Sequence, residues 1–545
     1  MTSDQLSSHG PGDTEKQFES GITTPDLVGD EKLKHHDQQK EFEDVQVNDL
    51  AASDEEYPTG RRLVPIIVSL VLSVFLVSLD MTIVGTAIPK ITDEFHGLDQ
   101  VAWYGAAYFM TFGGFQSASG KFFKYFPLKA SFIGSIGIFE LVSGVGAAGI
   151  ATGAFTMIAF AAKPALRPNM MGIVGAVYGL SSVIGPILGG VFSDKTTWRW
   201  CFFVNLPVGG LSAILIFIFF KTPKHAKVVP ATPKEKFLQM DPVGLILIMA
   251  GIISFILAMQ YGGQTHPWKS SVVIGLLVGA VLIWAVFIAW ESWQGERAML
   301  IPRLMKQHHM WQPSFFQFFF AAGYFVLLYY LPIYFQSVDN ATPIHSGVLN
   351  LPLVLGIALG STVSGIIVSK TGHAAPFMML GAVMGTVASG LIYTFDIGTG
   401  SGKWIGYQAL YGIFMGMGFQ MAINIAQASS KPEDISSATA MVFFFQTIGG
   451  AFAISAAQSG FVNRLLGVLP TSAPGVDPMK VIATGATEIR HAFSAGDVAG
   501  IVQAYMAGVK VTFIIMIALC STTIIAACMA PWKRINAESL SGGVA

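Results

Sequence analysis

Long apolar segments of roughly 20 residues recur along most of this 545-residue chain. An α-helix needs about 20 residues to cross a hydrocarbon core of about 30 Å. Only 12% of the residues are charged, against about 25% in soluble domains, so the chain cannot cover its apolar residues with polar surface. The sequence therefore predicts an all-α polytopic membrane protein whose solvent is lipid.

The charges between the apolar tracts predict a topology. Lys and Arg residues in short connections mark the cytoplasmic ends of spans. We therefore place residues 61–62, 121–129, 221–236 and 533–534 on the cytoplasmic side. The predicted tracts lie at residues 63–88, 101–119, 130–162, 170–192, 200–220, 241–262, 271–290, 314–336, 344–369, 375–396, 404–428, 435–461 and 509–531.

The tract at residues 130–162 has an unsuitable length. Basic residues at 121–129 and at 163–167 flank it, so both of its ends are expected in the cytoplasm and an even number of crossings is required. Its length corresponds to about 50 Å of helix, whereas two full spans need about 60 Å before any turn is counted. We expect either two shortened spans in a cramped pair or a missing piece of chain.

The N-terminal segment differs in composition from the rest of the chain. Residues 1–62 hold 15 of the 33 acidic residues and 6 of the 32 basic residues. With few apolar side chains, such a segment cannot bury enough surface to offset the entropy lost on ordering. We predict a disordered, acidic cytoplasmic tail over residues 1–60, followed by a first span that serves as an uncleaved targeting signal.

The sequence favours no metal, cofactor or enzymatic activity. Cys201, Cys520 and Cys528 all lie in apolar tracts, which argues against a disulfide framework or a metal cluster. The glycine-rich stretch Gly398–Lys403 lacks the spacing and the hydroxyl residue of a phosphate-binding loop. We expect an ion gradient to supply the energy of any transport, and no nucleic acid among the partners.

Two carboxylates lie inside predicted spans, Asp80 in the first tract and Glu140 in the third. Ionisable groups in a membrane are costly and usually face a polar cavity. Desolvation also favours the protonated form of a carboxyl group. Asp80 and Glu140 are therefore the candidate proton-coupling residues. The alternative for Asp80 is a structural carboxylate that is hydrogen-bonded by Thr82 or placed at a helix end.

Residues 175–190, which read GAVYGLSSVIGPILGG, place several glycines close to one helical stripe. Small residues at this spacing allow two helices to approach closely, and a proline kinks a membrane helix in a way that its neighbours can repair. On physical grounds alone the run is a packing face. Its members are Gly175, Gly179, Gly185, Pro186, Gly189 and Gly190.

Taken together, these motifs resemble the fourteen-span drug:proton antiporter group of the major facilitator superfamily, of the fungal efflux-pump type. The resemblance rests on the run that begins at Leu79-Asp80, the glycine–proline run, residues 194–207 and residues 351–365. It implies the major facilitator fold, with two six-span halves and a two-span central insert, one span of the N-terminal half being shortened or missing. It also implies export, because the glycine–proline motif is associated with exporters in that group.

The resemblance is incomplete in two places. The family's cytoplasmic gate loop is matched in part by Gly120, Lys121, Lys124 and Lys129, and Lys124 stands where many members have an acid. The family's fourth-span arginine has no counterpart, because Arg167 lies beyond the span. A truncated, non-transporting isoform is therefore one alternative.

Substrate contacts are expected from amide and aromatic side chains inside the spans. Amides are seldom turned toward lipid, and aromatic rings suit planar or lipophilic compounds. A lipid-facing or packing role is the alternative for many of the rings. The candidate cavity residues are Tyr108, Gln116, Tyr324, Tyr411, Gln420, Asn424 and Gln446.

We interpret the chain as a monomeric plasma-membrane carrier that exports small amphipathic compounds, such as toxins, secondary metabolites or drugs, in exchange for protons. The vacuolar membrane is an alternative location, and an importer of the same fold, for instance of siderophores, is an alternative function. Asn340 begins an acceptor sequon in a predicted outer loop and is a candidate glycosylation site.

The predicted organisation follows from these assignments. It comprises a tail (1–60), an N-terminal bundle (61–222), a linker with two inserted spans (223–300), the first part of a C-terminal bundle (301–461), an extracellular loop (462–508), a last span (509–531) and a cytoplasmic tail (532–545).

Overall fold

The computed structural model describes residues 63–95, 101–163, 166–223, 226, 228–484, 489–532 and 534. Within these ranges the regular elements are all helices, which confirms the predicted class. Eleven described helices are long and apolar enough to cross a membrane, and a shorter apolar helix covers Leu128–Phe139. The tail predicted over residues 1–60 lies outside the described residues.

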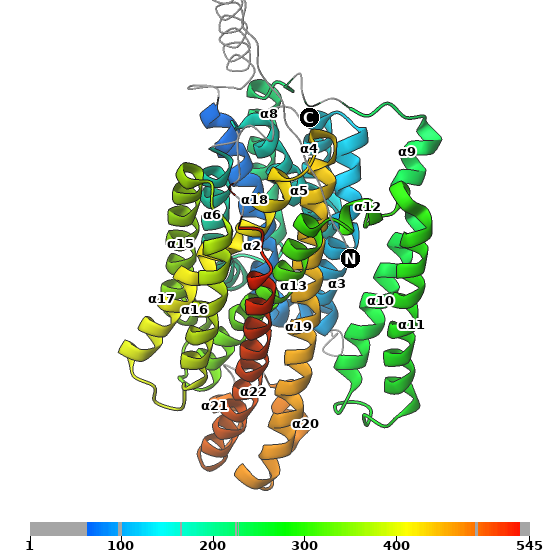
Figure 1. The fold of residues 1–545 in the computed structure, drawn as a ribbon. Coiled ribbons are helices and arrows are strands. Elements are labelled where there is room, and N and C mark those ends of the chain that lie inside the picture. The colour runs from blue at the N-terminus through cyan, green and yellow to red at the C-terminus, as the bar shows by residue number, and fades with distance from the viewer. Residues whose placement is uncertain are drawn as a thin grey trace, which may run out of the picture. The chain divides into compact units, whose positions relative to one another are not determined.

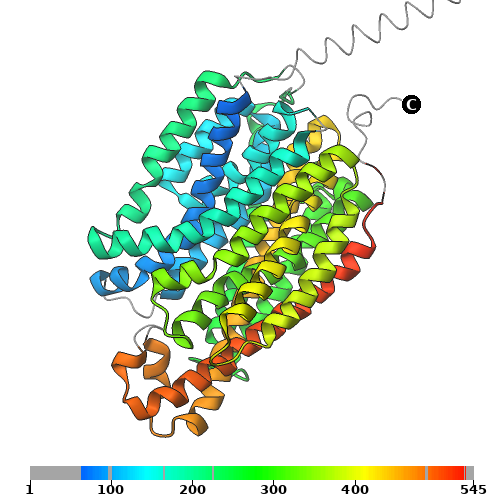
Figure 2. The same cartoon turned by 90° about the vertical axis from the view of Figure 1, so that its left-hand side faces the viewer.

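The N-terminal half is a bundle in which α2 packs against α6 and α8, and α3 packs against α5. Figure 2 draws this half in blue to teal, beside the green to red helices of the C-terminal half. Serine hydroxyls join two of its apolar helices, since Ser69 Oγ donates to the carbonyl of Ser212 at 2.8 Å. The helices are α2 (Leu63–Phe95), α3 (Val101–Tyr125), α4 (Leu128–Leu141), α5 (Ser143–Ala161), α6 (Arg167–Lys195), α7 (Trp200–Phe203) and α8 (Asn205–Phe219).

The insert follows the N-terminal half and is drawn in green beside the rest of the bundle (Figure 1). Asp241 caps α10 by accepting from the Gly244 N–H, and Ser270 caps α11 by accepting from the Val273 N–H. The two helices pack on each other, and α10 also contacts α3 and α19. The insert consists of α9 (Pro233–Gln239), α10 (Pro242–Tyr261) and α11 (Ser271–Gln294).

The C-terminal half is a second bundle. Its helix α15 packs against α17, and α13 packs against α19 and α22. The connection from the insert runs through η4 (Gly295–Arg297) and α12 (Pro302–Met305). The helices of the half are α13 (His308–Ser337), α14 (Pro343–Leu349), α15 (Leu351–Thr371), α16 (Ala375–Tyr393), α17 (Ser401–Phe419), α18 (Met421–Ala428), η5 (Pro432–Asp434), α19 (Ile435–Ser472), α20 (Pro478–Ala483), α21 (Ile489–Ala492) and α22 (Ala495–Cys528).

The tract at residues 130–162 forms a cramped helical pair, one of the two alternatives expected, but only α4 is short, because α5 is long enough to cross a membrane. Helix α4 has 14 residues and is separated from α5 by Val142 alone, so it spans only about 21 Å at 1.5 Å per residue. Gly146 lies against the backbone of Phe139, and Gly149 lies against Ser135. The glycines lack the Cβ atoms that would hold the two helices apart, and this close packing accommodates the short connection.

The last two long helices continue beyond the predicted tracts. The sequence interpretation treated residues 462–508 as a loop, whereas α19 runs to Ser472 and α22 begins at Ala495. In these extensions Leu465, Leu469 and Ile501 are buried. The apolar residues of the two extensions pack on one another, but they do not form a continuous apolar tract in the sequence. A search for such tracts therefore ended both helices too early.

Candidate functional site

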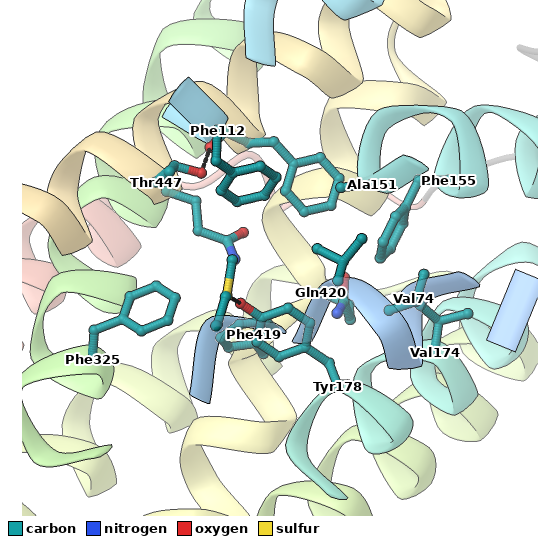
Figure 3. Close-up of a pocket in the computed structure, with 14 residues that line it drawn as sticks. Val74, Phe112, Ala151, Phe155, Val174, Tyr178, Phe325, Phe419, Gln420 and Thr447 are labelled. Atoms are coloured by element: carbon teal, nitrogen blue, oxygen red, sulfur yellow. Dashed lines mark hydrogen bonds between the residues drawn. The ribbon is translucent and has the colours of Figure 1, made fainter. Parts of the chain in front are cut away.

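The two halves enclose an apolar cavity in the middle of the bundle. Helices α2, α3, α5 and α6 supply one wall, and α13, α17 and α19 supply the other together with Gln420, which follows α17 (Figure 3). No lining residue is charged. The lining residues are Val74, Val77, Met81, Phe112, Ala151, Phe155, Val174, Tyr178, Phe325, Phe419, Gln420, Phe443, Gln446 and Thr447.

Two amides provide the main polarity of this cavity. Gln446 Oε1 accepts a hydrogen bond of 2.9 Å from Gln317 Nε2, which fixes the orientation of the Gln446 side chain. The Oε1 atom of Gln420 is buried and has no hydrogen-bond partner among the described residues. A buried amide oxygen without a partner is costly, and a compound that donates a hydrogen bond would satisfy it.

Aromatic pairs connect the halves around the cavity. The rings of Phe155 in α5 and Phe443 in α19 meet edge to face with centroids 4.8 Å apart. Tyr178 in α6 lies 6.1 Å from Phe419 in α17, again between ring centroids. These contacts are apolar and contain no ion pair, so they can separate without leaving a charge unpaired.

Asp80 is buried in α2, with 3% of the residue exposed. Asn205, at the start of α8, donates a hydrogen bond of 3.1 Å from Nδ2 to Asp80 Oδ1. The Ser143 side chain is a second hydrogen-bond partner, and it is placed there by the tight turn between α4 and α5. Both partners are uncharged. The next residue, Met81, lines the cavity and receives the Tyr178 hydroxyl on its sulfur at 2.9 Å.

The glycine run of α6 packs against both halves. Gly185 lies against Thr82 of α2, and Gly179 lies against Ile357 of α15. A Cβ atom on Gly175 would lie 2.6 Å from Ser361 Oγ and 2.9 Å from Gln420 Nε2. The run is therefore the surface along which α6 approaches α15, and it ends beside a cavity amide. Gly189 and Gly190 are also buried in α6, whereas the side chain of Pro186 lies outside the description.

The gate-loop residues divide between three neighbours. Gly120 lies against Ser436 and Ala440 of α19, which leaves no room for a side chain. Lys124 makes a 2.9 Å ion pair with the buried Asp434 at the start of α19. Lys129 instead donates to the carbonyl of Phe217 in α8 at 2.6 Å, and Lys121 turns toward the insert.

Asp434 also binds a second cation. Arg303 Nη2 lies 2.9 Å from Asp434 Oδ2 and Arg303 Nε lies 2.7 Å from Glu296 Oε1. The hydrogen bond to Glu296, with the contribution of Asp434, raises the pKa of Arg303 above its ordinary value. The basic residue at position 124, where an acid was expected, is thus matched by an acid on the opposite half.

The remaining predicted residues lie elsewhere. Gln116 donates to Thr152 at 2.6 Å inside the N-terminal half, and Tyr411 faces Cys520 inside the C-terminal half. Tyr324 contacts Phe419 behind the cavity wall at 5.5 Å between ring centroids. Asn424 is buried in α18, and Tyr108 donates to the carbonyl of Val77.

Two predicted residues have little structural context. The side chain of Glu140 lies outside the description, although the residue belongs to the last turn of α4. Asn340 is exposed just after α13 and has a positive φ of 56°.

Several site residues were not identified from the sequence. The rings of Phe112, Phe155 and Phe443 resemble the many aromatic residues of other spans, and no periodicity separates them. Asp434 had a detectable signal, because it is an acid in the short connection directly before the predicted apolar tract at residues 435–461. A search for acids complementary to Lys124 would have found it.

Comparisons with known proteins agree with this fold. The sequence model of the Major Facilitator Superfamily matches residues 138–454. The MFS-type transporter grgE of Penicillium sp is 50% identical over 534 residues, which cover 94% of each chain. The probable efflux pump gsfJ of Penicillium aethiopicum is 49% identical over 521 residues, which cover 91% of this chain and 93% of that protein.

Two further proteins extend the comparison. The MFS-type transporter thnB of Trichoderma harzianum is 52% identical over 484 residues, which cover 85% of this chain and 83% of that protein. The crystal structure of the human organic anion transporter MFSD10 has a similar fold, with a TM-score of 0.50 at 12% identity, over 86% of this chain and 100% of that chain.

Proposed function

Because the chain belongs to the Major Facilitator Superfamily, we propose that it is a secondary active exporter of small amphipathic organic compounds, driven by proton antiport across the plasma membrane. The observation that carries the proposal is the uncharged, aromatic cavity between the two halves. The names of two relatives, an MFS-type transporter and a probable efflux pump, support transport and its outward direction.

The cavity lining defines the substrate chemistry. Six aromatic side chains surround it, and its polar groups are two amides, one tyrosine and one threonine. Rings bind planar or lipophilic molecules through apolar contact. A charged compound would meet no counter-ion there and would lose its hydration without replacement. The preferred substrates are therefore neutral, ring-containing compounds that carry hydroxyl or carbonyl groups.

Alternating access follows from the contacts between the halves. At the end of the bundle that carries Lys124, here called the lysine-rich end, the Lys124–Asp434 pair and the Gly120 contact hold α3 against α19. Along the middle, the glycine run holds α6 against α15. Rocking of the halves about the α6–α15 contact, with the ion pair breaking and re-forming, exposes the cavity to each side in turn.

Proton coupling is assigned to Asp80. It is buried between uncharged hydrogen-bond partners. Neither partner neutralises the negative charge that appears when Asp80 loses its proton. Its neighbour Met81 lies in the cavity wall and contacts both halves, because the Tyr329 hydroxyl of α13 donates to its carbonyl at 3.4 Å. Gain or loss of the proton can thus move the wall that binds the substrate.

The test is efflux from intact cells that carry equal surface amounts of each variant. Cells loaded with a neutral fluorescent dye are placed in acidic medium, and efflux is compared for the parent chain, Asp80→Asn and the control Asp396→Asn, an exposed carboxylate at the far end. The parent and the control should export faster at acidic external pH, whereas Asp80→Asn should lose this dependence because an amide carries no exchangeable proton.

Each alternative has its own result. An importer would accumulate the dye above the level of cells without the protein. A non-transporting chain would match those cells at full surface expression. Unchanged pH-dependent efflux in Asp80→Asn would reject the role of Asp80 while leaving export in place.

A further inference from the structure

A buried cluster of ionisable groups lies where the insert meets the gate loop. Lys121 comes from the end of α3, Asp241 caps α10 and Glu291 lies near the end of α11. Their exposed fractions are 2%, 0% and 5%. Charged side chains are seldom buried this completely unless they are paired. The transport cycle described above uses none of the three.

The backbone holds Asp241 in one orientation. Its φ of 47° is left-handed, a conformation that costs energy outside glycine. Its Oδ1 atom accepts from the Gly244 N–H at 3.0 Å and from Trp290 Nε1 at 2.9 Å. With two donors on Oδ1, the other oxygen, Oδ2, is directed toward Glu291.

Glu291 has a complementary arrangement. Its Oε2 atom accepts from the Leu300 N–H at 2.6 Å, which leaves Oε1 directed toward Asp241. Both Asp241 Oδ2 and Glu291 Oε1 lie beside Gly244, where a Cβ atom would collide with either. Contact with this one position brings the two carboxyl groups together, and no donor among the described residues reaches either inner oxygen.

We propose that Asp241 and Glu291 share one proton, and that they form a proton-binding site of the insert that is separate from Asp80. Two carboxylates this close in a buried site cannot both stay ionised. One proton between Oδ2 and Oε1 gives each inner oxygen a partner and leaves a single negative charge. A divalent cation does not fit as well, because calcium requires about six to eight oxygen ligands and only two inner oxygens converge here.

Lys121 connects this site to the gate. Its ammonium donates to Gln239 Oε1 at 3.3 Å and to the Glu296 carbonyl at 2.7 Å. The remaining charge of the carboxyl pair also attracts it. When the shared proton leaves, a second negative charge faces Lys121 and draws the ammonium away from these two acceptors.

Other charged groups face the same region. Lys124 lies on the same helix as Lys121 and pairs with Asp434 across the halves. Glu235 of α9 binds Gln239 and Arg297, and Glu296 binds Arg303. Binding or loss of the shared proton therefore affects the end of α3 that closes the gate. The effect passes through Lys121 and through the connection after α11, whose Glu296 carbonyl Lys121 binds.

The experiment is infrared difference spectroscopy of the purified full chain in lipid nanodiscs, titrated from neutral to alkaline pH. All variants carry Asp80→Asn and Glu140→Gln, so that the two other carboxyl groups predicted inside spans add no signal. The chain with Asp241 and Glu291 intact should show the carbonyl stretch of a protonated carboxyl group at neutral pH and lose it at alkaline pH. Glu291→Gln and Asp241→Asn should each abolish the band, because either amide donates to the opposite carboxylate and replaces the proton.

The control Glu235→Gln removes a partly exposed carboxylate close by and should keep the band. Loss of the band in both single amide variants, with an unchanged melting temperature, establishes the shared proton. Persistence of the band in either variant would overturn the proposal, since it would place the proton on one residue alone. The measurement needs no transport, so failure of the export proposal would not affect it.

Discussion

Replacing Asp434 by Asn should open the lysine-rich end of the transporter. In the structure the Asp434 carboxylate binds Lys124 at 2.9 Å and Arg303 at 2.9 Å, and its side chain is 1% exposed. The Asn side chain keeps the volume but leaves Lys124 without a counter-charge, whereas Arg303 keeps its ion pair with Glu296. Breaking a buried pair in this way costs about 3 kcal/mol, and we take the lower limit because the Arg303 side chain is 42% exposed.

The substitution destabilises only the closed state, in which Lys124 and Asp434 are paired. The open state is unaffected, because opening separates the two residues. At about 1.4 kcal/mol per factor of ten, the equilibrium should shift toward the open state by about 100-fold. A cysteine placed at Ser437 reports the change. Ser437 is buried, and its Cα would lie 3.1 Å from a Cβ atom on Gly120, so a thiol there is accessible only when α3 leaves α19.

The assay is the rate of labelling of Ser437→Cys by a water-soluble maleimide, in a chain whose exposed Cys528 is replaced by Ser. Adding Asp434→Asn should raise the rate by up to about 100-fold. The matched control is Asp396→Asn, which breaks the exposed pair between Asp396 and Lys510 at the other end. Exposed pairs contribute about 0–1 kcal/mol, so the control rate should stay the same. Equal labelling rates with and without Asp434→Asn would refute the gate assignment.

Three further outcomes are expected. Gly175→Leu should abolish efflux at normal surface expression, because a side chain there meets Ser361. The control Gly210→Ala should be neutral, since nothing lies within 4 Å of its position. Equal efflux from both variants would contradict the packing role. Gly146→Leu should separate α4 from α5 and reduce the folded yield, measured by the monodisperse fraction in size-exclusion chromatography, and a normal yield would argue against the cramped pair. Asn340→Gln should abolish any endoglycosidase-sensitive mobility shift of the parent chain, and a parent chain without such a shift would reject glycosylation at this site.

The prediction of the fold from the sequence was accurate because lipid imposes a simple rule. Every backbone group inside a membrane must be hydrogen-bonded within its own helix or barrel, so apolar length alone indicates most spans. The same reasoning located the length conflict at residues 130–162, which the structure resolves as the short helix α4 packed on the glycines of α5. It was less accurate for α19 and α22, whose outer ends bury apolar residues against each other.

The sequence by itself determined the helical membrane architecture, the burial of Asp80 in a span and the glycine surface of α6. These features depend on local composition, which is visible one segment at a time. Only the tertiary structure decided which polar groups meet: Gln420 and Gln446 line the cavity, while Gln116 and Tyr411 lie within their own halves. The structure also paired Lys124 with Asp434, 310 residues away, and placed Asp241 and Glu291 together beside Gly244. Such pairings depend on the rotation of each helix about its axis, and packing between helices sets that rotation.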